Sequence, residues 1–350
     1  MNLLLVDQFS EIGGAQLCVR SLLPEMRRRG WRIEKFVPPP VARYSNGHKT
    51  AGDILRYAFD MRAAASAIRS VVRQYSIDLV LVNGPRVLAA SVGLDRPVVF
   101  YSHSILRKWY ARILARWSLD RTGAAVIAAS EYVAKTLSLL VSPARIQVIY
   151  SGVADLSAAV ATHDGPPRVG VLGRIAPEKG QLHFVEAARR CPDAHFLIFG
   201  ASRFASSGYE RRVRARAKGA PVEFRGWMDK PSDALAELDI VAIPSMHYDG
   251  APRVVLEALS AAKPVVAYRS GGIPELIEDG QTGILTDAPT AESLAHSITT
   301  LLLDPQRRNK LARNARRAWC ERFQLERYQR EICDALERAA RKAVLNSARA

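Results

Sequence analysis

The sequence predicts an α/β protein made of two domains, each with a parallel sheet covered by helices. Short apolar runs alternate with longer stretches of helical periodicity along the whole chain, as they do in βαβ units. This series stops and restarts at a stretch of small and turn-forming residues near the middle of the chain. The length of 350 residues also exceeds the roughly 100–200 residues that one domain usually holds.

In the first half, apolar runs rich in Leu, Val and Ile predict six strands. Helical periodicity predicts helices near residues 15–29, 55–74, 105–117 and 131–141. The start of the chain has no basic segment, and its apolar run is too short for a signal peptide, so we expect a strand there. The six strands are expected at Leu3–Asp7, Arg32–Val37, Asp78–Asn83, Val98–Tyr101, Ala124–Ala129 and Ile146–Tyr150.

The stretch 151–167 contains small residues, an Asp-Gly and a Pro-Pro, a composition typical of a linker. We therefore place the first domain at residues 1–160 and the second at 161–315. Helices of the second domain are expected to start near Gly180, Tyr209, Arg253 and Ala291. Its strands are expected at Arg168–Leu172, His195–Phe199, Val222–Phe224, Ile240–Pro244, Val265–Tyr268 and Ile284–Thr286.

From about residue 305 the sequence is helical and basic and carries an apolar stripe that must pack on a core. One or two helices are expected to fold back across both domains, with residues 316–350 packing on the first. The stripe consists of Leu311, Trp319, Phe323, Tyr328, Ile332, Cys333 and Leu336.

Composition restricts the function classes. With 48% apolar and 24% charged residues the chain is globular rather than disordered. A net charge of +16 indicates an anionic partner, and nucleic acid, an anionic membrane surface and phosphorylated substrates all fit it. No nucleic-acid-reading module is recognisable, so we expect no nucleic-acid partner.

The four cysteines are far apart and lack zinc-ligand spacing, so we expect reduced structural thiols and no metal site. No run of 18 or more apolar residues is present, and hence no bilayer-spanning helix is expected. These observations predict a cytoplasmic protein, either free or resting on the inner face of the cell membrane.

The loop Gly173–Gly180 joins a predicted strand to a predicted helix. Gly173 lets backbone come close to a ligand, and the two cations Arg174 and Lys179 flank the helix start. A planar guanidinium and a mobile ammonium suit a diphosphate. A connecting loop with solvated charges has a similar composition, so both interpretations stay open at this point.

Two further loops follow later strands of the same domain. Asp249 precedes a helix and Glu257 lies about two turns along it, where a carboxylate can accept hydrogen bonds from paired ribose hydroxyls. Acidic residues at helix starts are also ordinary features. Gly271-Gly272 makes a sharp strand-to-helix turn that either approaches a ligand or is a plain connection.

Three such loops in order, each at the carboxyl end of a strand, form a more specific pattern. The chain resembles the retaining glycosyltransferases of family 4, which have the GT-B fold of two Rossmann-like domains facing across a cleft. Gly173–Gly180 is similar to the family's G-R-x4-K-G element, Asp249–Glu257 to its E-x7-E element, and Gly271–Glu275 to its G-G-x-x-E turn.

The resemblance implies that Arg174 and Lys179 bind the donor diphosphate. It also implies that Glu257 binds the ribose and that Asp249 faces the donor sugar, with transfer that retains anomeric configuration. No D-x-D is present, so the two cations are expected to replace a metal, and the nucleotide diphosphate-sugar is a donor substrate rather than a cofactor. The expected donor-binding residues are Gly173, Arg174, Lys179, Asp249, Gly250, Arg253, Val254 and Glu257.

This sequence departs from the family pattern at two places. Asp249 replaces the usual Glu and shortens the carboxylate by one methylene. After it, Gly250-Ala251-Pro252-Arg253 replaces the common Gly-Phe-Gly-Leu, and Pro252 removes one backbone donor. Arg253 adds a cation near the expected phosphates, which either compensates for the lost donor or favours an acidic sugar.

In the first domain, the segment Phe9–Gln16 resembles the family's glycine-rich acceptor-side loop, in which Gly13 and Gly14 would bring amides to the cleft. His103 resembles the histidine that faces the reacting sugar from that side. A histidine after a strand is otherwise usually an exposed polar residue. The expected catalytic residues are His103, Asp249, Arg174 and Lys179.

We therefore expect an enzyme that moves a sugar from a nucleotide diphosphate-sugar to a glycan or lipid-linked acceptor, in cell-surface polysaccharide or glycolipid biosynthesis. A sugar-nucleotide epimerase or hydrolase of the same fold and a non-catalytic sensor or scaffold are the alternatives. Residues 107–121 combine basic and aromatic side chains and suit an anionic membrane surface. A helix packed on its own core with a solvated basic face fits them equally well.

Overall fold

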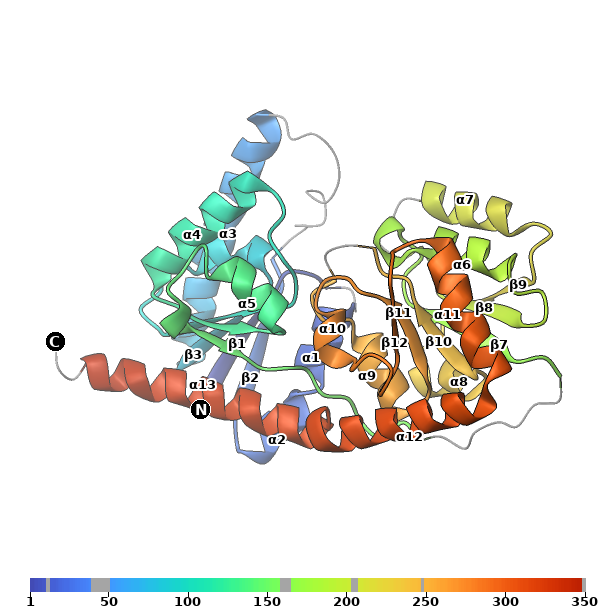
Figure 1. Ribbon diagram of the computed structural model, residues 1–350. Coiled ribbons are helices and arrows are strands. Elements are labelled where there is room, and N and C mark those ends of the chain that lie inside the picture. The colour runs from blue at the N-terminus through green and yellow to red at the C-terminus, as the bar shows by residue number, and fades with distance from the viewer. Residues whose placement is uncertain (11–12, 39–50, 158–164, 203–206, 247–248, 348–350) are drawn as a thin grey trace. The chain divides into compact units, whose positions relative to one another are not determined.

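A computed structural model describes residues 1–10, 13–38, 51–157, 165–202, 207–246 and 249–347 of the chain (Figure 1). Contacts divide the chain into two compact units. The first comprises Met1–Ser151 with Glu326–Ala350, and the second comprises Gly152–Leu325. The domain boundary expected at residues 160 and 161 falls in the segment 158–164, which lies outside the described residues.

The first unit contains a six-stranded parallel sheet with strand order β2-β1-β3-β4-β5-β6. The strands β1, β3 and β4 are apolar throughout most of their length and almost wholly buried, as expected of parallel strands covered on both faces. All six predicted strands are confirmed. Their bounds are β1 Asn2–Asp7, β2 Arg32–Phe36, β3 Leu79–Asn83, β4 Val98–Ser102, β5 Ala125–Ala128 and β6 Ile146–Val148.

One helix prediction in the first unit is wrong in detail. The segment 15–29 forms two helices, α1 (Gly14–Arg20) and α2 (Leu23–Arg28), because Pro24 has no amide hydrogen and begins a new helix. The other elements are α3 (Ala51–Gln74), the 3-10 helix η2 (Pro85–Ser91), α4 (Trp109–Thr122), α5 (Glu131–Leu137) and η3 (Pro143–Arg145).

The second unit contains another six-stranded parallel sheet, with strand order β12-β11-β10-β7-β8-β9. All six predicted strands are again confirmed, and each unit has its own hydrophobic core. The bounds are β7 Arg168–Leu172, β8 His195–Phe199, β9 Val222–Gly226, β10 Ile240–Ile243, β11 Val265–Tyr268 and β12 Ile284–Thr286.

The helices of the second unit begin close to the predicted positions, and α10 (Ile273–Leu276) follows the Gly271-Gly272 turn, where a helix was expected. The helix α8 (Pro231–Ala236) was not predicted, because its six residues are too few to show a helical period in the sequence. Asp304 caps α12 and Pro305 takes its first position, which ends α11. The bounds are η4 Pro177–Lys179, α6 Gln181–Ala188, α7 Ser207–Ala217, α8 Pro231–Ala236, α9 Arg253–Ser260, α10 Ile273–Leu276, α11 Ala291–Leu303 and α12 Pro305–Arg322.

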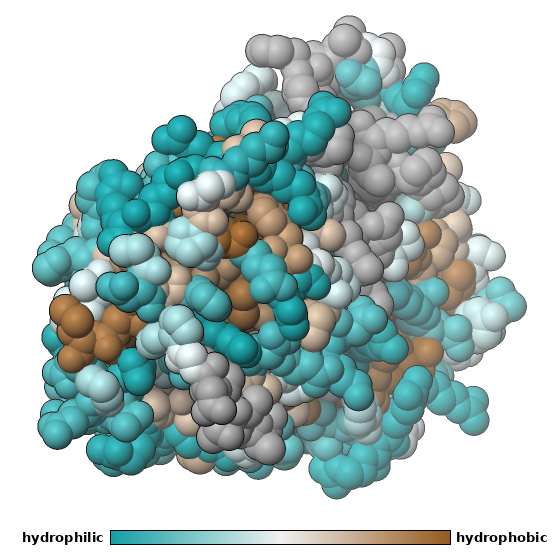
Figure 2. Space-filling view, turned by 90° about the vertical axis from the view of Figure 1, so that its right-hand side faces the viewer, coloured by the Kyte–Doolittle hydropathy of each residue, from teal (hydrophilic) through white to brown (hydrophobic). Residues whose placement is uncertain are grey.

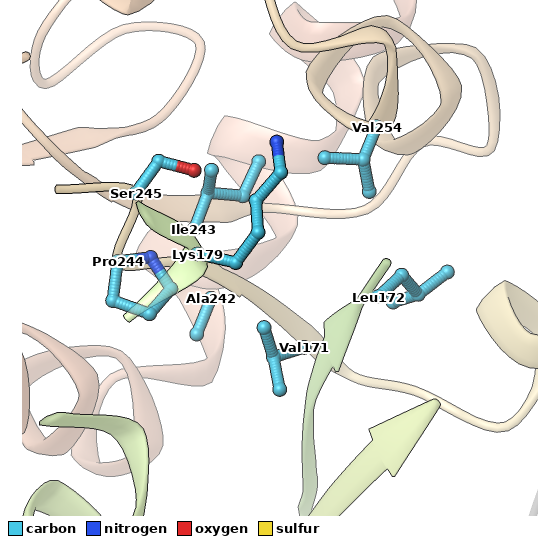
Figure 3. Close-up of a pocket in the computed structure, with 8 residues that line it drawn as sticks. All are labelled: Val171, Leu172, Lys179, Ala242, Ile243, Pro244, Ser245 and Val254. Atoms are coloured by element: carbon cyan, nitrogen blue, oxygen red, sulfur yellow. The ribbon is translucent and has the colours of Figure 1, made fainter. Parts of the chain in front are cut away.

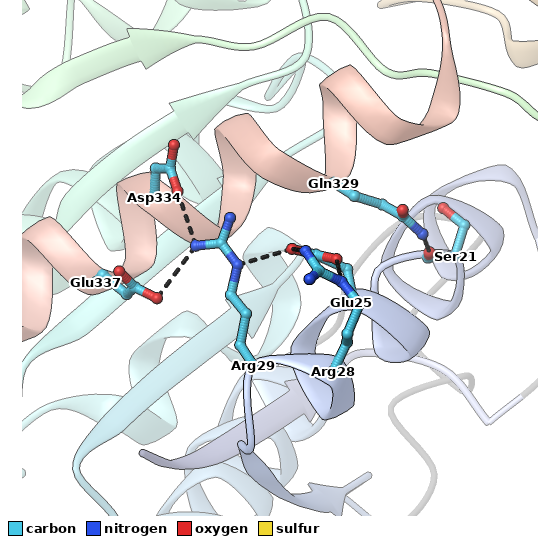
Figure 4. Close-up of polar contacts among 7 residues, drawn as sticks. All are labelled: Ser21, Glu25, Arg28, Arg29, Gln329, Asp334 and Glu337. Atoms are coloured by element: carbon cyan, nitrogen blue, oxygen red, sulfur yellow. Dashed lines mark hydrogen bonds and ion pairs between the residues drawn. The ribbon is translucent and has the colours of Figure 1, made fainter.

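The last helix, α13 (Leu325–Ser347), packs within the first unit through the predicted apolar stripe. Tyr328, Ile332 and Leu336 are fully buried. The Tyr328 hydroxyl lies 3.1 Å from that of Tyr101. Polar contacts to α2 reinforce this packing, because Arg29 lies within 2.7 Å of Asp334 and 3.1 Å of Glu337 (Figure 4).

The surface is rich in charge. Hydrophilic residues predominate on the face seen in Figure 2, and hydrophobic residues appear there in separate patches. Cys18, Cys191 and Cys333 are buried free thiols, whereas Cys320 is exposed. Within the described ranges, no helix is long and apolar enough to cross a membrane.

Candidate functional site

The three predicted loops of the second unit leave neighbouring strands. They follow β7, β10 and β11, which are consecutive in the sheet. Because all these strands are parallel, their carboxyl ends share one edge, where ligands bind in doubly wound sheets. The first and second loops therefore meet in the structure, where Lys179 contacts Asp249 although the two residues are 70 positions apart in the sequence.

The first loop is fixed by the buried side chain of Gln181. Its amide nitrogen donates to the carbonyl of Arg174 (2.7 Å), and its oxygen accepts from the amide of Ala176 (3.3 Å). The Arg174 guanidinium is 35% exposed and contacts Glu178 at 2.8 Å. Sequence reasoning did not identify Gln181, although a polar residue directly after the loop glycine was a usable signal.

Gly180 joins the first loop to the second. Its φ of 69° favours glycine, and a Cβ there would lie 1.9 Å from the carbonyl oxygen of Pro244. The amide of Met246 also donates to the carbonyl of Glu178 (2.8 Å). The glycine is thus required for contact between two protein loops.

Lys179 and Asp249 are in direct contact. The Lys179 Nζ lies 2.5 Å from Asp249 Oδ2, and the hydroxyl of Ser245 donates to the same oxygen (3.2 Å). The Lys179 stem lines a small pocket with Ile243 and Val254, and its nitrogen points toward the gap between Ser245 and Val254 (Figure 3). Two side chains expected to contact different parts of a donor therefore meet.

The third loop supports the second through its backbone. The amide of Gly272 donates to the carbonyl of Asp249 (2.9 Å). The Ser270 hydroxyl donates to the backbone carbonyl of Ser245 (2.6 Å). Gly271 has a φ of 57°, and a Cβ there would lie 2.1 Å from the Asp249 carbonyl oxygen. The close approach considered for Gly271 and Gly272 is therefore made to protein backbone.

Arg253 and Glu257 lie one turn apart on α9 and form an ion pair, with Arg253 Nε 2.8 Å from Glu257 Oε1. Burial raises the pKa of the Glu257 carboxyl, and Arg253 opposes that shift. Arg253 thus neutralises the carboxylate assigned to the ribose, a contact that the sequence analysis did not foresee.

In the first unit, Gly13 and Gly14 lie at the start of α1, beside a buried polar network. The amide of Gly13 donates to the side chain of Gln16 (3.2 Å), which donates in turn to the buried Asp7 (2.8 Å). Asn83, at the end of β3, donates to the other oxygen of Asp7 (3.1 Å). The sequence analysis missed this network, although Asp7 and Asn83 both end apolar strands.

His103 follows β4, and its ring lies 3.9 Å from that of Tyr101, centroid to centroid. The residue is partly exposed, but its Nε2 is buried and has no hydrogen-bond partner in the part of the chain that the structure describes. Burial lowers the pKa of His103 to about 3. The imidazole is therefore neutral at pH 7 and can offer one donor and one acceptor.

The helix α4 leaves its largest side chains outside the core. Trp109, Ile113 and Trp117 are 72%, 61% and 46% exposed, whereas Ala115 and Leu119 are buried. The helix therefore packs through small and aliphatic residues, and the aromatic residues do not belong to the core. The interpretation of residues 107–121 as a helix whose apolar face is buried is wrong for these three side chains.

Two Rossmann-like units with ligand-type loops at their sheet edges define the GT-B class of proteins. A family model described as glycosyl transferases group 1 matches residues 154–318, and one described as glycosyltransferase family 4 matches residues 12–155. A solved structure of Anabaena HepE with UDP and glucose has a TM-score of 0.78 at 24% identity and covers 96% of this chain and 99% of that one.

Curated relatives of the chain are also glycosyltransferases or sugar-transferring synthases, as the two family models indicate. Alpha-maltose-1-phosphate synthase of Mycolicibacterium smegmatis is 30% identical over 278 residues, which cover 67% of this chain and 71% of that protein. Alpha-D-kanosaminyltransferase of Streptomyces kanamyceticus is 35% identical over 159 residues, 43% of this chain and 40% of that protein. The chain spans less than half the length of several curated relatives that it matches. It belongs to family 4 of the glycosyltransferases.

Proposed function

We propose that the protein is a glycosyltransferase that moves a sugar from a nucleotide diphosphate-sugar to a glycan or lipid-linked acceptor, in the synthesis of cell-surface polysaccharide or glycolipid. The contact between Lys179 and Asp249 carries the proposal, because it joins the loop suited to phosphates to the loop suited to a sugar. Membership of family 4 supports the same activity.

Arg174 and Lys179 would hold the donor diphosphate. In this structure each cation contacts one carboxylate, Glu178 for Arg174 and Asp249 for Lys179, so a diphosphate has to compete with one negative charge at each. As the bond to the sugar breaks, the leaving diphosphate gains charge, and two preorganised cations stabilise it. On this basis we propose transfer without an obligatory metal ion.

Asp249 would turn from Lys179 to the hydroxyls of the donor sugar, and the Glu257 carboxylate would accept hydrogen bonds from the ribose hydroxyls. The bond from the anomeric carbon to the diphosphate breaks, the acceptor oxygen bonds to that carbon on the same face, and the acceptor proton passes to the diphosphate. The similarity of the three loops to the family-4 elements supports retention of configuration.

The acceptor side would be formed by the first unit. A neutral His103 with a buried, unpartnered Nε2 suits a hydrogen bond to a sugar hydroxyl better than it suits proton transfer from a cationic state. Gly13 and Gly14 would place backbone near the same ligand, and the contacts between Gln16 and Asp7 support that loop.

We also propose that α4 rests on an anionic membrane surface at the inner face of the cell membrane. The exposed Trp109, Ile113 and Trp117 can enter the headgroup region. Arg112 and Arg116, on the same helix, would attract anionic lipids. This arrangement fits a lipid-linked acceptor.

A thermal-shift titration with UDP-, GDP- and ADP-sugars tests donor binding, and UDP-glucose is the first choice because HepE was solved with it. A matching donor should raise the melting temperature, since a ligand of the folded state stabilises by mass action. Arg174→Ala and Glu257→Ala should each weaken binding at least tenfold. Arg211→Ala, at an exposed position on α7, removes one positive charge as Arg174→Ala does and should leave donor binding unchanged.

Product formation with a supplied acceptor separates transfer from the alternatives. A sensor would bind donor and yield no product, and an epimerase or hydrolase would consume donor without acceptor. No stabilisation by any nucleotide sugar would contradict the proposed function as a whole.

A further inference from the structure

Buried polar atoms without partners gather at one edge of the first unit's sheet. Among the described residues, four buried side-chain nitrogen or oxygen atoms lack a hydrogen-bond partner. Three of them lie at or just after the ends of the adjacent strands β3 and β4, namely Asn83 Oδ1, Arg86 Nη1 and His103 Nε2. Because buried polar groups are nearly always paired, this concentration calls for a ligand that completes them.

Arg86 is the cation of this set, and neutral groups hold it in place. It lies in η2, directly after β3. Its amide donates to the side chain of Gln8 (3.4 Å), and its carbonyl accepts from the hydroxyl of Tyr57 (2.9 Å). Its guanidinium carbon lies 5.0 Å from the centroid of the Phe9 ring. The backbone of Arg86 is thus held by hydrogen bonds and its guanidinium by the Phe9 ring, whereas Nη1 has no partner among the described residues.

Within the described part of the chain, no carboxylate forms an ion pair with Arg86. The described ion pairs include Arg29, Arg174 and Arg253, each with an acidic partner, but none that involves Arg86. Burial lowers the pKa of Arg86, and the hydroxyl groups of Tyr57 and Tyr110 oppose that shift. An uncompensated, half-buried guanidinium is costly, and a ligand that carries the missing charge would relieve that cost.

We propose that Arg86 binds an oxyanion, a phosphate or carboxylate group carried by the acceptor. The fork of a guanidinium matches both groups with two parallel hydrogen bonds. Asn83 and His103 lie on the same edge of the sheet and would form hydrogen bonds with hydroxyl groups of the same molecule. The identification of the ligand as the acceptor rests on the proposed function, whereas the oxyanion site itself does not.

Inorganic phosphate and acetate are the probes, used with the full chain. Because Arg174 and Lys179 also suit phosphate, the titration uses an Arg174→Ala/Lys179→Ala background. Phosphate should still bind there, and Arg86→Gln should weaken binding at least tenfold. Arg73→Gln, an exposed position on α3 with the same change in charge, should not weaken it. Equal binding by the Arg86→Gln and Arg73→Gln variants would overturn the proposal.

The two probes also distinguish the two kinds of acceptor. Stronger binding of phosphate than of acetate would indicate a phosphorylated acceptor, and stronger binding of acetate would indicate a uronate.

Three further measurements distinguish a binding role from a structural one. Without anion, the Arg86→Gln variant should unfold at no lower temperature than the Arg73→Gln variant, because Arg86 loses no ion pair with any described residue. Earlier unfolding would count against a binding role. Arg86→Lys keeps the charge and should restore part of the binding.

In a transfer assay, Arg86→Gln should raise KM at least tenfold for an anionic acceptor and leave the affinity for the nucleotide sugar unchanged. If phosphate binds through Arg86 and no nucleotide sugar binds anywhere, the oxyanion site stands and the proposed function fails.

Discussion

Asp249 and Glu257 each lie against a cation, and the two contacts arise differently. Arg253 and Glu257 are one helical turn apart, so α9 by itself brings them together. Lys179 and Asp249 meet only because β7 and β10 are neighbours in the sheet. Lys179 and Asp249 are 22% and 18% exposed, so the loss of either leaves a partly desolvated charge on the other.

His103 should make the protein sensitive to acid. Burial lowers its pKa to about 3, so between that value and the ordinary value of about 6.5 the unfolded chain binds more protons than the folded one. The contribution to stability is fully present above about pH 6.5 and is lost as the pH falls toward 3, at up to about 1.4 kcal/mol per pH unit. Urea unfolding at a series of pH values measures this slope.

His103→Asn should flatten the slope, because asparagine does not titrate. His296→Asn, on the exposed face of α11, serves as the control and should keep it. If the wild-type protein and the His103→Asn variant lose stability in parallel, the imidazole is not held neutral by burial.

At the scale of elements, the candidate donor site is a set of connected loops. Gly180 lets the first loop contact Pro244, and Gly271 lets the third contact the backbone of Asp249. These contacts fix the backbone positions of Lys179 and Asp249 before any ligand arrives. A preorganised backbone makes electrostatic stabilisation more effective, because only the side chains then have to rearrange when the donor binds.

The helix α4 should bind anionic vesicles. Full burial of one large apolar side chain contributes about 1.5–3 kcal/mol, so replacing Trp109 and Trp117 together by serine should weaken binding at least tenfold. Sedimentation with phosphatidylglycerol vesicles at low salt measures this. Added salt should weaken binding too, because it screens the contribution of the arginines.

The control for α4 is Leu303→Ser on α11, which alters a side chain that is 80% exposed in the second unit. That variant should bind vesicles like the wild-type protein. Equal binding to neutral and anionic vesicles, or none at low salt, would contradict the membrane proposal.

At the scale of the whole molecule, the chain completes the first unit only with its last helix. Ile332 of α13 is fully buried in the first unit, and Ile298 of α11 is fully buried in the core of the second. Replacing either by alanine should cost about 2–5 kcal/mol. The effects should be separate, because each side chain belongs to the core of a different unit.

Hydrogen exchange resolved along the chain measures the two effects. Ile332→Ala should speed exchange in β1 to β6 and leave nucleotide-sugar binding unchanged, whereas Ile298→Ala should speed it in β7 to β12. Uniform loss of protection in both units from Ile332→Ala would show that the chain unfolds as one cooperative block.

The sequence by itself determined the strands and the loops that follow them. A fully buried parallel strand needs an uninterrupted apolar run, and that requirement is local, so runs such as Leu3–Val6 and Val265–Tyr268 were readable without a structure. The residues of the candidate donor site were also identifiable, because glycine, cations and carboxylates lie at fixed spacings around the strand ends. The break between α1 and α2 could also have been predicted from Pro24, but one continuous helix was predicted there.

Only the tertiary structure decided which of these side chains meet. Strand order is set by packing between segments far apart in the sequence, so the contact of Lys179 with Asp249 could not be read from spacing. Burial is likewise a property of the whole fold. The same composition that allowed α4 to be a core helix left Trp109 exposed. Arg86 looked ordinary in the sequence, yet it is a half-buried cation with no ion pair to any residue that the structure describes.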